Sequence, residues 1–398
     1  MGESFRFIHC SDLHLGCGFS GISKNDPSLG KRLRESVFEA LDKIVHTAKK
    51  EKADFVIFSG DIFDSENETP LTRSRFAEAL AAIKVPCYIA YGNHDAKRRW
   101  ESSIPLPKNA YVFPEEITHI YAEKNGTRLA EIIGCSFRAS SPDADVTENV
   151  AKESDLFGIG VFHCTVDGAS ENNYAPCKLL SLRVKKLDYW ALGHIHKREI
   201  LSQTPYVVYS GNTQGMDPKE SGEKGAYLVV VENGKVKDMR FFRTGPVQWQ
   251  DVECDMTGMT DLKQLTTAVS SQAEKGAMVS LRLTGRTRLD SMLRIDPEGF
   301  KEVLYNALDC NVVSVNIRTV PDIDLDARED TGDFISAVLN YSRRVSQFKR
   351  EELLNIICST TTANNIRDRF EEFSDEELRD IVKDASYLIV EKMMEAER

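Results

Sequence analysis

The sequence predicts an α/β fold with a mixed sheet, or two packed sheets, followed by a small α/β unit and C-terminal helices. Buried strand-like runs alternate with segments of helical spacing in the first part of the chain, and later apolar runs are short and joined by loops. The 398 residues, 41% hydrophobic and 28% charged, have ordinary globular composition. The length suits one large domain and one or two smaller ones.

The first domain is expected to span residues 1–245 and to begin with a β-α-β-α-β order. The segments FRFIHC, DFVIF and PCYIAY read as its first three strands. The helix between the first two is predicted by apolar residues at helical spacing, namely Leu33, Val37, Leu41, Ile44, Val45 and Ala48. Thr69-Pro70 predicts an N-cap followed by proline at the first position of the next helix. Further strands are expected at EIIGCSF, LFGIGVFH, YWALGH, YVVYS and AYLVVVE.

Two smaller regions are expected after Thr244-Gly245-Pro246. Residues 246–322 predict a small α/β unit with strands near Trp249, at MVSLRLT and at VVSVNI. Its second helix is expected to open at Asp296-Pro297. Residues 323–398 follow the acidic stretch DIDLDARED and are expected to be helical, and the last helix opens with a capping box of Ser374 and Glu377.

Composition and charge narrow the class of protein. No apolar run is long enough to span a bilayer, and the N-terminus resembles no secretory signal. The nine cysteines are scattered without a CxxC pair, which favours reduced thiols and a cytoplasmic protein. No membrane partner is expected. The net charge of −11 argues against tight, sequence-neutral DNA binding by the isolated chain.

Five short polar motifs each follow a predicted strand directly. They are Asp12-Leu13-His14, Gly60-Asp61, Gly92-Asn93-His94-Asp95, His163 and Gly193-His194-Ile195-His196. Because open α/β sheets collect ligands at the carboxyl ends of their strands, we expect these motifs to meet at one place. In an extended backbone, Asp12 and His14 would project to the same side, as would His194 and His196.

The residue types of these motifs predict a centre of two divalent metal ions. Mixed oxygen and imidazole ligands suit Mn, Fe or Zn, and seven ligands are about right for two ions that share a carboxylate: Asp12, His14, Asp61, Asn93, His163, His194 and His196. Two such ions can clamp the attacking and leaving oxygens of a phosphoryl transfer and can activate water. His94 would stabilise the phosphate or protonate the leaving oxygen. His9 on a strand, His46 on a helix and His119 in a loop are expected to be non-functional.

Together these motifs resemble the calcineurin-like metallophosphoesterase superfamily. The resemblance implies a sandwich of two mixed sheets flanked by helices and a phosphate-contacting catalytic role for His94. It also implies that one metal is held by Asp12, His14, Asp61 and His196, and the second by Asp61, Asn93, His163 and His194. The metal pair is most consistent with two Mn²⁺ ions, with Fe or Zn as alternatives.

Further segments are similar to the DNA double-strand-break repair nucleases of the SbcD type. These are HCTVDG from His163 and YSGNTQG from Tyr209. This branch implies DNA cleavage in repair, a capping domain at 246–322, C-terminal docking on a coiled-coil SMC-like ATPase of the SbcC type, and a homodimer. The better-studied nucleases carry histidine where this chain has Asp64, which leaves exonuclease against endonuclease preference open.

Basic residues beside the motifs are candidates for contact with substrate. Arg98 and Arg99 follow the third motif between Lys97 and Trp100, and Lys197-Arg198 follow the fifth. Asp64 is a further candidate at the substrate. Solvated charged faces explain such clusters equally well.

Two other functions share the same motifs. A small-molecule nucleotide phosphodiesterase or pyrophosphatase would use the same metal site, although it would need no cap unit or helical tail. A non-catalytic scaffold of this fold would keep the sheets, but such proteins usually lose ligands, and this chain keeps the complete set including His94.

Overall fold

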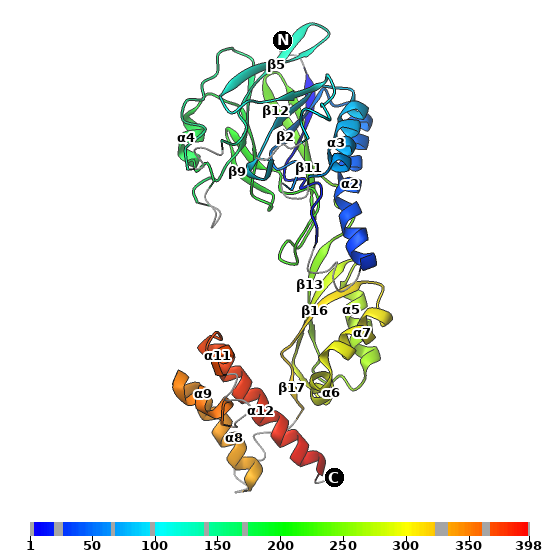
Figure 1. Ribbon diagram of the computed structural model, residues 1–398, viewed down its shortest axis with the longest axis vertical. Coiled ribbons are helices and arrows are strands. Elements are labelled where there is room, and N and C mark those ends of the chain that lie inside the picture. The colour runs from blue at the N-terminus through cyan, green and yellow to red at the C-terminus, as the bar shows by residue number, and fades with distance from the viewer. Residues whose placement is uncertain are drawn as a thin grey trace. The chain divides into compact units, whose positions relative to one another are not determined.

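The computed structural model describes residues 4–19, 27–64, 68–95, 100–138, 143–168, 174–322, 333–359 and 367–396. Its contacts divide the chain into two compact units, Met1–Trp249 and Gln250–Arg398 (Figure 1). The domain limits expected at residues 245 and 322 stay a prediction. Within the described ranges, no helix has the length and apolar character that crossing a membrane requires.

The first unit contains two six-stranded sheets, and both are mixed, as predicted. The order in the first sheet is β12 (Lys235–Arg243), β11 (Gly225–Glu232), β1 (Phe5–Cys10), β2 (Phe55–Ser59), β3 (Cys87–Ala90) and β4 (Ala110–Val112). The order in the second is β5 (Thr118–Lys124), β6 (Thr127–Gly134), β7 (Phe157–His163), β8 (Tyr189–Gly193), β10 (Tyr206–Tyr209) and β9 (Glu199–Gln203). Strands β1 to β4 are parallel to one another, as are β7 and β8.

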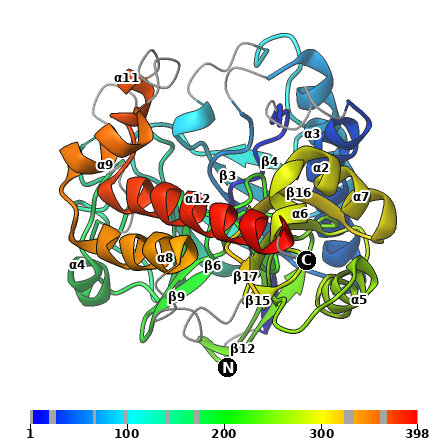
Figure 2. The ribbon, with the colours of Figure 1, turned by 90° about the horizontal axis from the view of Figure 1, so that it is seen from below.

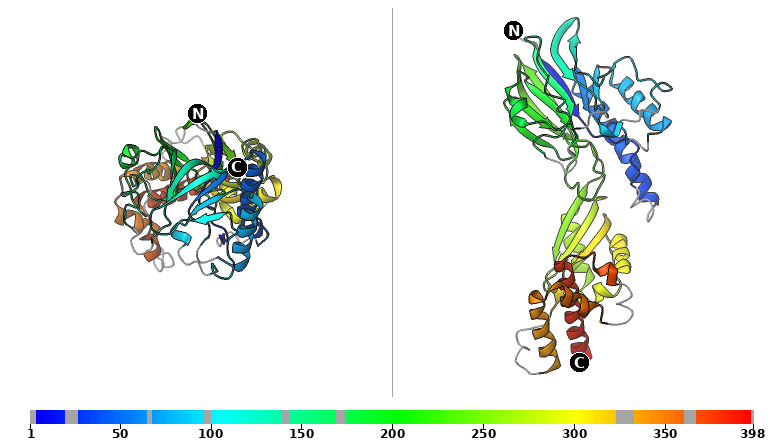
Figure 3. Two further views of the ribbon diagram at one scale, coloured as in Figure 1. Left: turned by 90° about the horizontal axis from the view of Figure 1, so that it is seen from above. Right: turned by 60° about the vertical axis from the view of Figure 1, so that its left-hand side comes forward.

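An aromatic core joins the two sheets. The Phe7 and Phe55 rings of the first sheet stack with centroids 5.2 Å apart, and Phe7 also meets Tyr189 of the second sheet edge-on at 5.2 Å. Helices α2 (Pro27–Lys50) and α3 (Pro70–Ile83) lie beside the first sheet (Figure 3). The Phe76 ring of α3 meets the Phe58 ring of β2 edge-on, with centroids 5.6 Å apart. Burying each large side chain of this kind stabilises the fold by roughly 1.5–3 kcal/mol.

Several local predictions for the first unit can be compared with the structure. Thr69 caps α3 as expected, since its hydroxyl accepts from Thr72 N at 3.2 Å and Pro70 opens the helix. The sequence did not predict β4, β5, β9, β12 or the short α4 (Leu179–Val184). The placement of His119 in a loop was wrong: it lies in β5, where its Nδ1 is 2.8 Å from Glu131 Oε1.

The second unit combines a small sheet with helices. Its sheet has the order β13 (Trp249–Asp255), β14 (Met278–Thr284), β16 (Asn311–Ile317), and α5 (Leu262–Gln272) and α7 (Pro297–Ala307) share a hydrophobic core with it. The helix α6 (Asp290–Ile295) and the paired strands β15 (Arg286–Thr287) and β17 (Val320–Pro321) complete this part.

Helices form the end of the second unit. Helix α12 (Asp375–Ala396) packs against α8 (Phe334–Arg344) and α9 (Arg350–Ile357), and α11 (Arg367–Phe370) precedes it (Figure 2). The predicted capping box is confirmed, because Ser374 N donates to Glu377 Oε2 at 2.7 Å and Glu377 N donates to Ser374 Oγ at 3.3 Å.

Candidate metal centre

All five polar motifs lie at the carboxyl ends of strands. Asp12, Asp61 and Asn93 follow the neighbouring parallel strands β1, β2 and β3 of the first sheet, while His163 ends β7 and His194 follows β8 in the second. The ends of the two sheets are in contact, since His163 Nδ1 lies 3.0 Å from the Ser59 carbonyl oxygen at the end of β2. The convergence predicted from the order of the motifs is therefore present.

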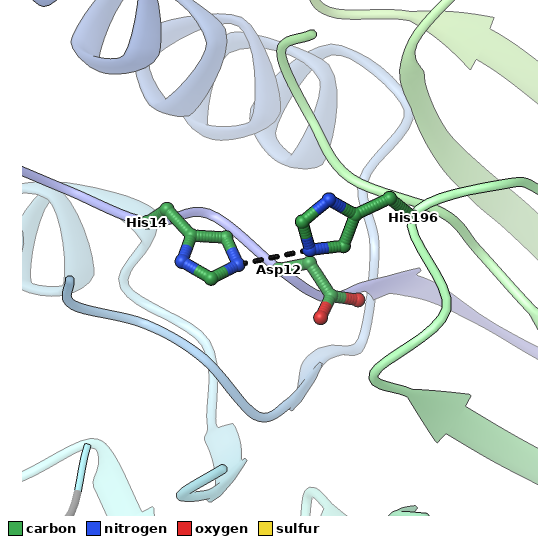
Figure 4. A group of neighbouring side chains, drawn as sticks. All are labelled: Asp12, His14 and His196. Carbon is green, nitrogen blue, oxygen red and sulfur yellow. Dashed lines mark hydrogen bonds between the residues drawn. The ribbon is translucent and has the colours of Figure 1, made fainter. Parts of the chain in front are cut away.

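One group of side chains consists of Asp12, His14 and His196. One ligand atom of each lies within 4.8 Å of the others. The Nε2 atoms of His14 and His196 face each other at 3.1 Å, with the Asp12 carboxylate beside them (Figure 4). Two imidazole nitrogens and a carboxylate directed at one point fit a divalent cation of the borderline class.

The second group consists of Asp61, His163 and His194, and Asn93 joins it. His163 Nε2 lies 3.0 Å from Asn93 Oδ1 and 3.2 Å from Asp61 Oδ2. The same Asp61 oxygen lies 3.8 Å from His14 Nε2 of the first group. Asp61 therefore stands between the two groups, which is the position that a bridging carboxylate needs.

Two hydrogen bonds orient histidines from behind. His163 Nδ1 faces the Ser59 carbonyl oxygen, and His196 Nδ1 faces Glu220 Oε1 at 2.5 Å, so each ring directs Nε2 into the centre. Asn212 Nδ2 holds the other oxygen of Glu220 at 2.7 Å. Glu220 was not predicted from the sequence, although Asn212, which bonds to it, belongs to the YSGNTQG motif.

The charges inside the centre are coupled. Burial opposes ionisation of Asp61, but His163 and His14 beside it hold its pKa below the ordinary value. Burial acts against protonation of His163 too, yet Asp61 raises the pKa of this histidine to about 9. Because a metal-bound imidazole must be neutral, cation binding at His163 has to displace a proton near neutral pH. Burial lowers the pKa of His14 to about 4, so this ring is already neutral.

The backbone of the centre is left-handed at four positions. The φ angles are 52° at Asp12, 45° at His14, 49° at Asp61 and 96° at His194. The extended backbone expected for the Asp12-Leu13-His14 motif was therefore wrong, although the two side chains do meet in one group. Such conformations cost about 1–3 kcal/mol each and are concentrated at functional sites.

Glycines make room for the ligand groups. A Cβ at Gly60 would lie 2.2 Å from His163 Nδ1, and one at Gly92 would lie 2.2 Å from Asp61 Oδ1. Of these two, only Gly60, with φ of 97°, also needs the conformational freedom of glycine. At Gly60 both the positive φ and the approach of His163 require glycine, whereas at Gly92 the approach of Asp61 is the reason.

Asp95 ties two motif loops together. Its carboxylate accepts from the backbone N–H groups of Ile62 at 3.1 Å, Phe63 at 2.8 Å and Gly92 at 2.8 Å. Burial, together with the nearby charge of Asp61, raises the pKa of Asp95 to about 7, and the three hydrogen bonds oppose this shift. The sequence singled out Asp95 only as the last residue of its motif, so this clamp was not predicted.

His94 lies at the edge of the centre. Its backbone N–H donates to Asp61 Oδ1 at 2.8 Å, while its ring is 44% exposed and lies 4.9 Å from the His14 ring, measured between centroids. Asp64 Oδ1 lies 3.3 Å from His94 Nδ1, and this hydrogen bond raises the pKa of His94. The structure thus places Asp64 against the predicted catalytic histidine.

The other substrate candidates are described only in part. Lys97, Arg98 and Arg99 lie outside the described residues. Trp100 is half-buried, and its Nε1 donates to the Glu68 carbonyl oxygen at 3.2 Å. His9, expected to pack, is fully buried with its Nδ1 3.0 Å from the Tyr189 hydroxyl.

This fold and donor set define a metal-dependent phosphoesterase. The sequence pattern of the family described as calcineurin-like phosphoesterase matches residues 5–198. The chain is 34% identical over 322 residues to the uncharacterized metallophosphoesterase YhaO of Bacillus subtilis (strain 168), covering 77% of this chain and 78% of the relative. The chain therefore belongs to the calcineurin-like metallophosphoesterase family, whose members hydrolyse phosphoesters with a dimetal site.

Two further relatives are more distant. The DNA double-strand break repair protein Mre11 of Methanococcus maripaludis is 27% identical over 275 residues, covering 63% of this chain and 67% of the relative. One of the subunits of the nuclease SbcCD of Escherichia coli (strain K12) is 25% identical over 291 residues, covering 59% of this chain and 67% of the relative.

Proposed function

We propose that this phosphoesterase hydrolyses DNA phosphodiester bonds, as an exo- or endonuclease in DNA repair, with two Mn²⁺ ions. The observation that carries the proposal is the pair of ligand groups with Asp61 between them. In this assignment, one ion is held by Asp12, His14, His196 and Asp61, and the other by Asp61, Asn93, His163 and His194. Two such ions supply an activated water and neutralise charge on the phosphate.

The side chains around the ions have separate tasks. Asp64 holds the Nδ1–H of His94, so that Nε2 of this exposed ring is free to face the substrate. His94 then gives its proton to the leaving oxygen of the cleaved bond. Ser59 and Glu220 fix the rings of His163 and His196, and the Asp95 clamp holds the loops that carry Asp61 and Asn93.

The choice of DNA as substrate rests on the relatives. Both Mre11 and the matched component of SbcCD are named for nuclease or DNA-repair functions, and they match this chain over about the same length. We further propose that Arg98 and Arg99 contact the DNA backbone. The net charge of −11 limits the affinity of the isolated chain for DNA. A partner protein would therefore supply further contacts with the DNA.

The helical end of the second unit offers a surface for that partner. A groove of about 490 Å³ lies among α8, α9 and α12 and is lined mainly by apolar side chains, among them Phe334, Tyr341, Ile357 and Ile389. Phe334 is 64% exposed and Ile389 48%. We propose that this groove docks a coiled-coil ATPase of the SbcC type. A cytoplasmic location and a homodimer formed through the predicted first domain, residues 1–245, also belong to the proposal.

A nuclease assay tests the function. End-labelled single- and double-stranded DNA is incubated with the full chain and Mn²⁺, Fe²⁺ or Zn²⁺, beside a panel of nucleotides and dinucleoside pyrophosphates. We expect metal-dependent DNA cleavage that Asp61→Ala abolishes and Asp42→Asn, on the exposed face of α2, leaves intact. Hydrolysis of the nucleotide panel without DNA cleavage would replace DNA by a small nucleotide substrate.

A further inference from the structure

A second cavity borders the metal centre at the backbone of His196. Its volume is about 230 Å³, and we name it the Lys224 pocket. Three segments enclose it: residues 196–198 after β8, residues 210–212 after β10, and residues 221–225, which lead into β11. These segments all belong to the first unit. None of the catalytic or metal-binding roles proposed above involves this cavity.

The lining of the Lys224 pocket is positively charged. Lys197, Arg198 and Lys224 face one carboxylate, that of Glu223. Arg198 reaches Glu223 at 3.8 Å, and its guanidinium lies over the Phe241 ring at 3.8 Å. Lys197 is exposed and makes no ion pair within the described parts of the chain. An excess of positive charge in an acidic protein marks a place where an anion is favoured.

Lys224 forms the inner wall of the pocket with a buried ammonium group. It is only 9% exposed, and its Nζ donates to the His196 carbonyl oxygen at 3.2 Å. The charges of Glu220 and Asp12 act on this ammonium group, but Glu220 already accepts hydrogen bonds from Asn212 and the Met216 backbone and faces His196. An ammonium carries three donors, so an anion in the pocket would stabilise a charge that is costly to bury.

The far wall of the pocket is held rigidly to the metal centre. Gly211 has φ of 73°, and a Cβ there would lie 2.7 Å from Arg198 N. The neighbouring Ser210 Oγ lies 2.8 Å from Ser11 Oγ, which donates to Asp12 Oδ2 at 2.5 Å. A group in the pocket would therefore be held at a fixed position beside the first group of metal ligands.

We propose that the Lys224 pocket binds a second phosphate of the substrate, next to the one that is cleaved. This proposal rests on the proposed function only in assuming a substrate with more than one phosphate. A purely structural role, in which Lys224 supports the His196 loop, would need neither Lys197 nor Arg198, because neither side chain is hydrogen-bonded to that loop in the described structure.

Two matched pairs of chromogenic substrates test the proposal without DNA. One pair is thymidine 5′-(p-nitrophenyl phosphate) with and without a 3′-phosphate, and the other is thymidine 3′-(p-nitrophenyl phosphate) with and without a 5′-phosphate. For the full chain with Mn²⁺, we expect kcat/KM to favour the doubly phosphorylated member of one pair by about tenfold or more. In the Lys197→Gln/Arg198→Gln double variant, this ratio should fall to near one.

The control is Lys235→Gln at the β11–β12 hairpin, because Lys235 is exposed and lies at the opposite end of β11 from the pocket. It should keep the wild-type ratio. No preference in either pair, or the same preference in the double variant, would contradict the binding of a second phosphate in the Lys224 pocket. A preserved preference without DNA cleavage would instead refute DNA as the substrate and leave the pocket standing, so the two proposals fail separately.

Discussion

Asp64 Oδ1 lies 3.3 Å from His94 Nδ1, and this contact decides how the exposed ring meets the substrate. We predict that Asp64→Asn lowers kcat on DNA by about 10- to 100-fold, since loss of a general acid typically costs 10²–10⁴-fold and the ring itself remains. A p-nitrophenyl phosphodiester should lose much less, because nitrophenolate leaves without a proton.

The pH profile of the same variant gives a second readout. The Asp64 hydrogen bond raises the pKa of His94, and the acid form of a histidine exists below its pKa. Without the carboxylate charge this pKa falls, so the alkaline limb of kcat on DNA should move to lower pH. An unmoved limb, or equal losses on both substrates, would show that Asp64 does not act through His94.

Gly92 is a position where one methyl group should disable the centre. A Cβ there would meet Asp61 at 2.2 Å from Oδ1 and 2.6 Å from the backbone nitrogen. We predict that Gly92→Ala displaces the bridging carboxylate, lowers activity at least 100-fold, and costs about 1–3 kcal/mol of unfolding free energy. Gly18→Ala, which would meet no atom within 4 Å, is the control. Calorimetric titration measures how many metal ions each variant binds and how tightly. If Gly92→Ala bound two ions with wild-type affinity, the prediction would be contradicted.

The sequence predicted which side chains meet but not how the backbone presents them. Asp12, Asp61 and His163 converge because each lies at the carboxyl end of a parallel strand, and this relation can be read from strand order alone. The left-handed φ angles at Asp12 and Asp61 depend on loop packing, which no residue type encodes. Glu220 was missed because a glutamate outside a strand end has no distinguishing spacing, and only its partner Asn212 in the YSGNTQG motif could have pointed to it.

At the scale of elements, Asp95 connects the loop after β2 to the loop after β3. Its two oxygens accept from three backbone N–H groups, those of Ile62, Phe63 and Gly92. We predict that Asp95→Asn destabilises the metal-free protein by about 1–3 kcal/mol, since the amide nitrogen cannot accept and leaves a buried donor unpaired. Urea denaturation measures this loss. Asp42→Asn, on the exposed face of α2, is the matched surface control. An unchanged urea midpoint in Asp95→Asn would show that Asp95 does not stabilise the two loops.

The contact between a buried histidine of β1 and the second sheet makes the stability of the fold depend on pH. His9 of β1 is buried with its Nδ1 3.0 Å from the Tyr189 hydroxyl of β8, and burial lowers the pKa of His9 to about 3. A histidine that must stay neutral in the folded state contributes stability that is present above its unfolded pKa of about 6.5. This stability is lost as pH falls from there toward 3, by up to about 1.4 kcal/mol per pH unit.

We therefore predict that His9→Gln flattens the pH dependence of unfolding free energy between pH 6.5 and 4 by about one proton. The measurement is urea denaturation in the presence of a chelator, so that metal release does not contribute. His46→Gln, on the exposed face of α2, should keep the wild-type slope. The same slope in His9→Gln would show that this histidine is not the titrating group.

Strands that the sequence did not predict are those with few buried positions. Of the residues in β9 and β12, none is fully buried, so the apolar alternation that identifies a strand is missing. The strands β2 and β7, which are buried throughout, were predicted nearly to the residue. Burial therefore decided which elements could be predicted, and His119 was misplaced because it lies in the half-buried strand β5.

At the scale of the whole molecule, the proposed catalytic residues and the proposed docking groove lie in different units of the chain. All seven proposed ligands, His94, Asp64 and the Lys224 pocket belong to Met1–Trp249, while the apolar groove belongs to Gln250–Arg398. The large aromatic core of the first unit is its own, and contains residues of both of its sheets. Sequence periodicity predicts each unit's elements, but it contains no information on contacts between units.

This division predicts that the first unit works alone on small substrates. A fragment of residues 1–249 keeps its complete core, including Trp249, whose ring packs against Gly215. We expect it to bind two metal ions and to hydrolyse a p-nitrophenyl phosphodiester at a rate within about fivefold of the full chain, since that substrate needs only the metal centre. Under the proposed function, DNA cleavage by the fragment should fall much further, because the fragment lacks the second unit and the contacts with DNA and a partner that we propose for it. If the fragment is folded by circular dichroism but inactive on the small substrate, the second unit contributes to the chemistry, and the assignment of catalysis to the first unit is wrong.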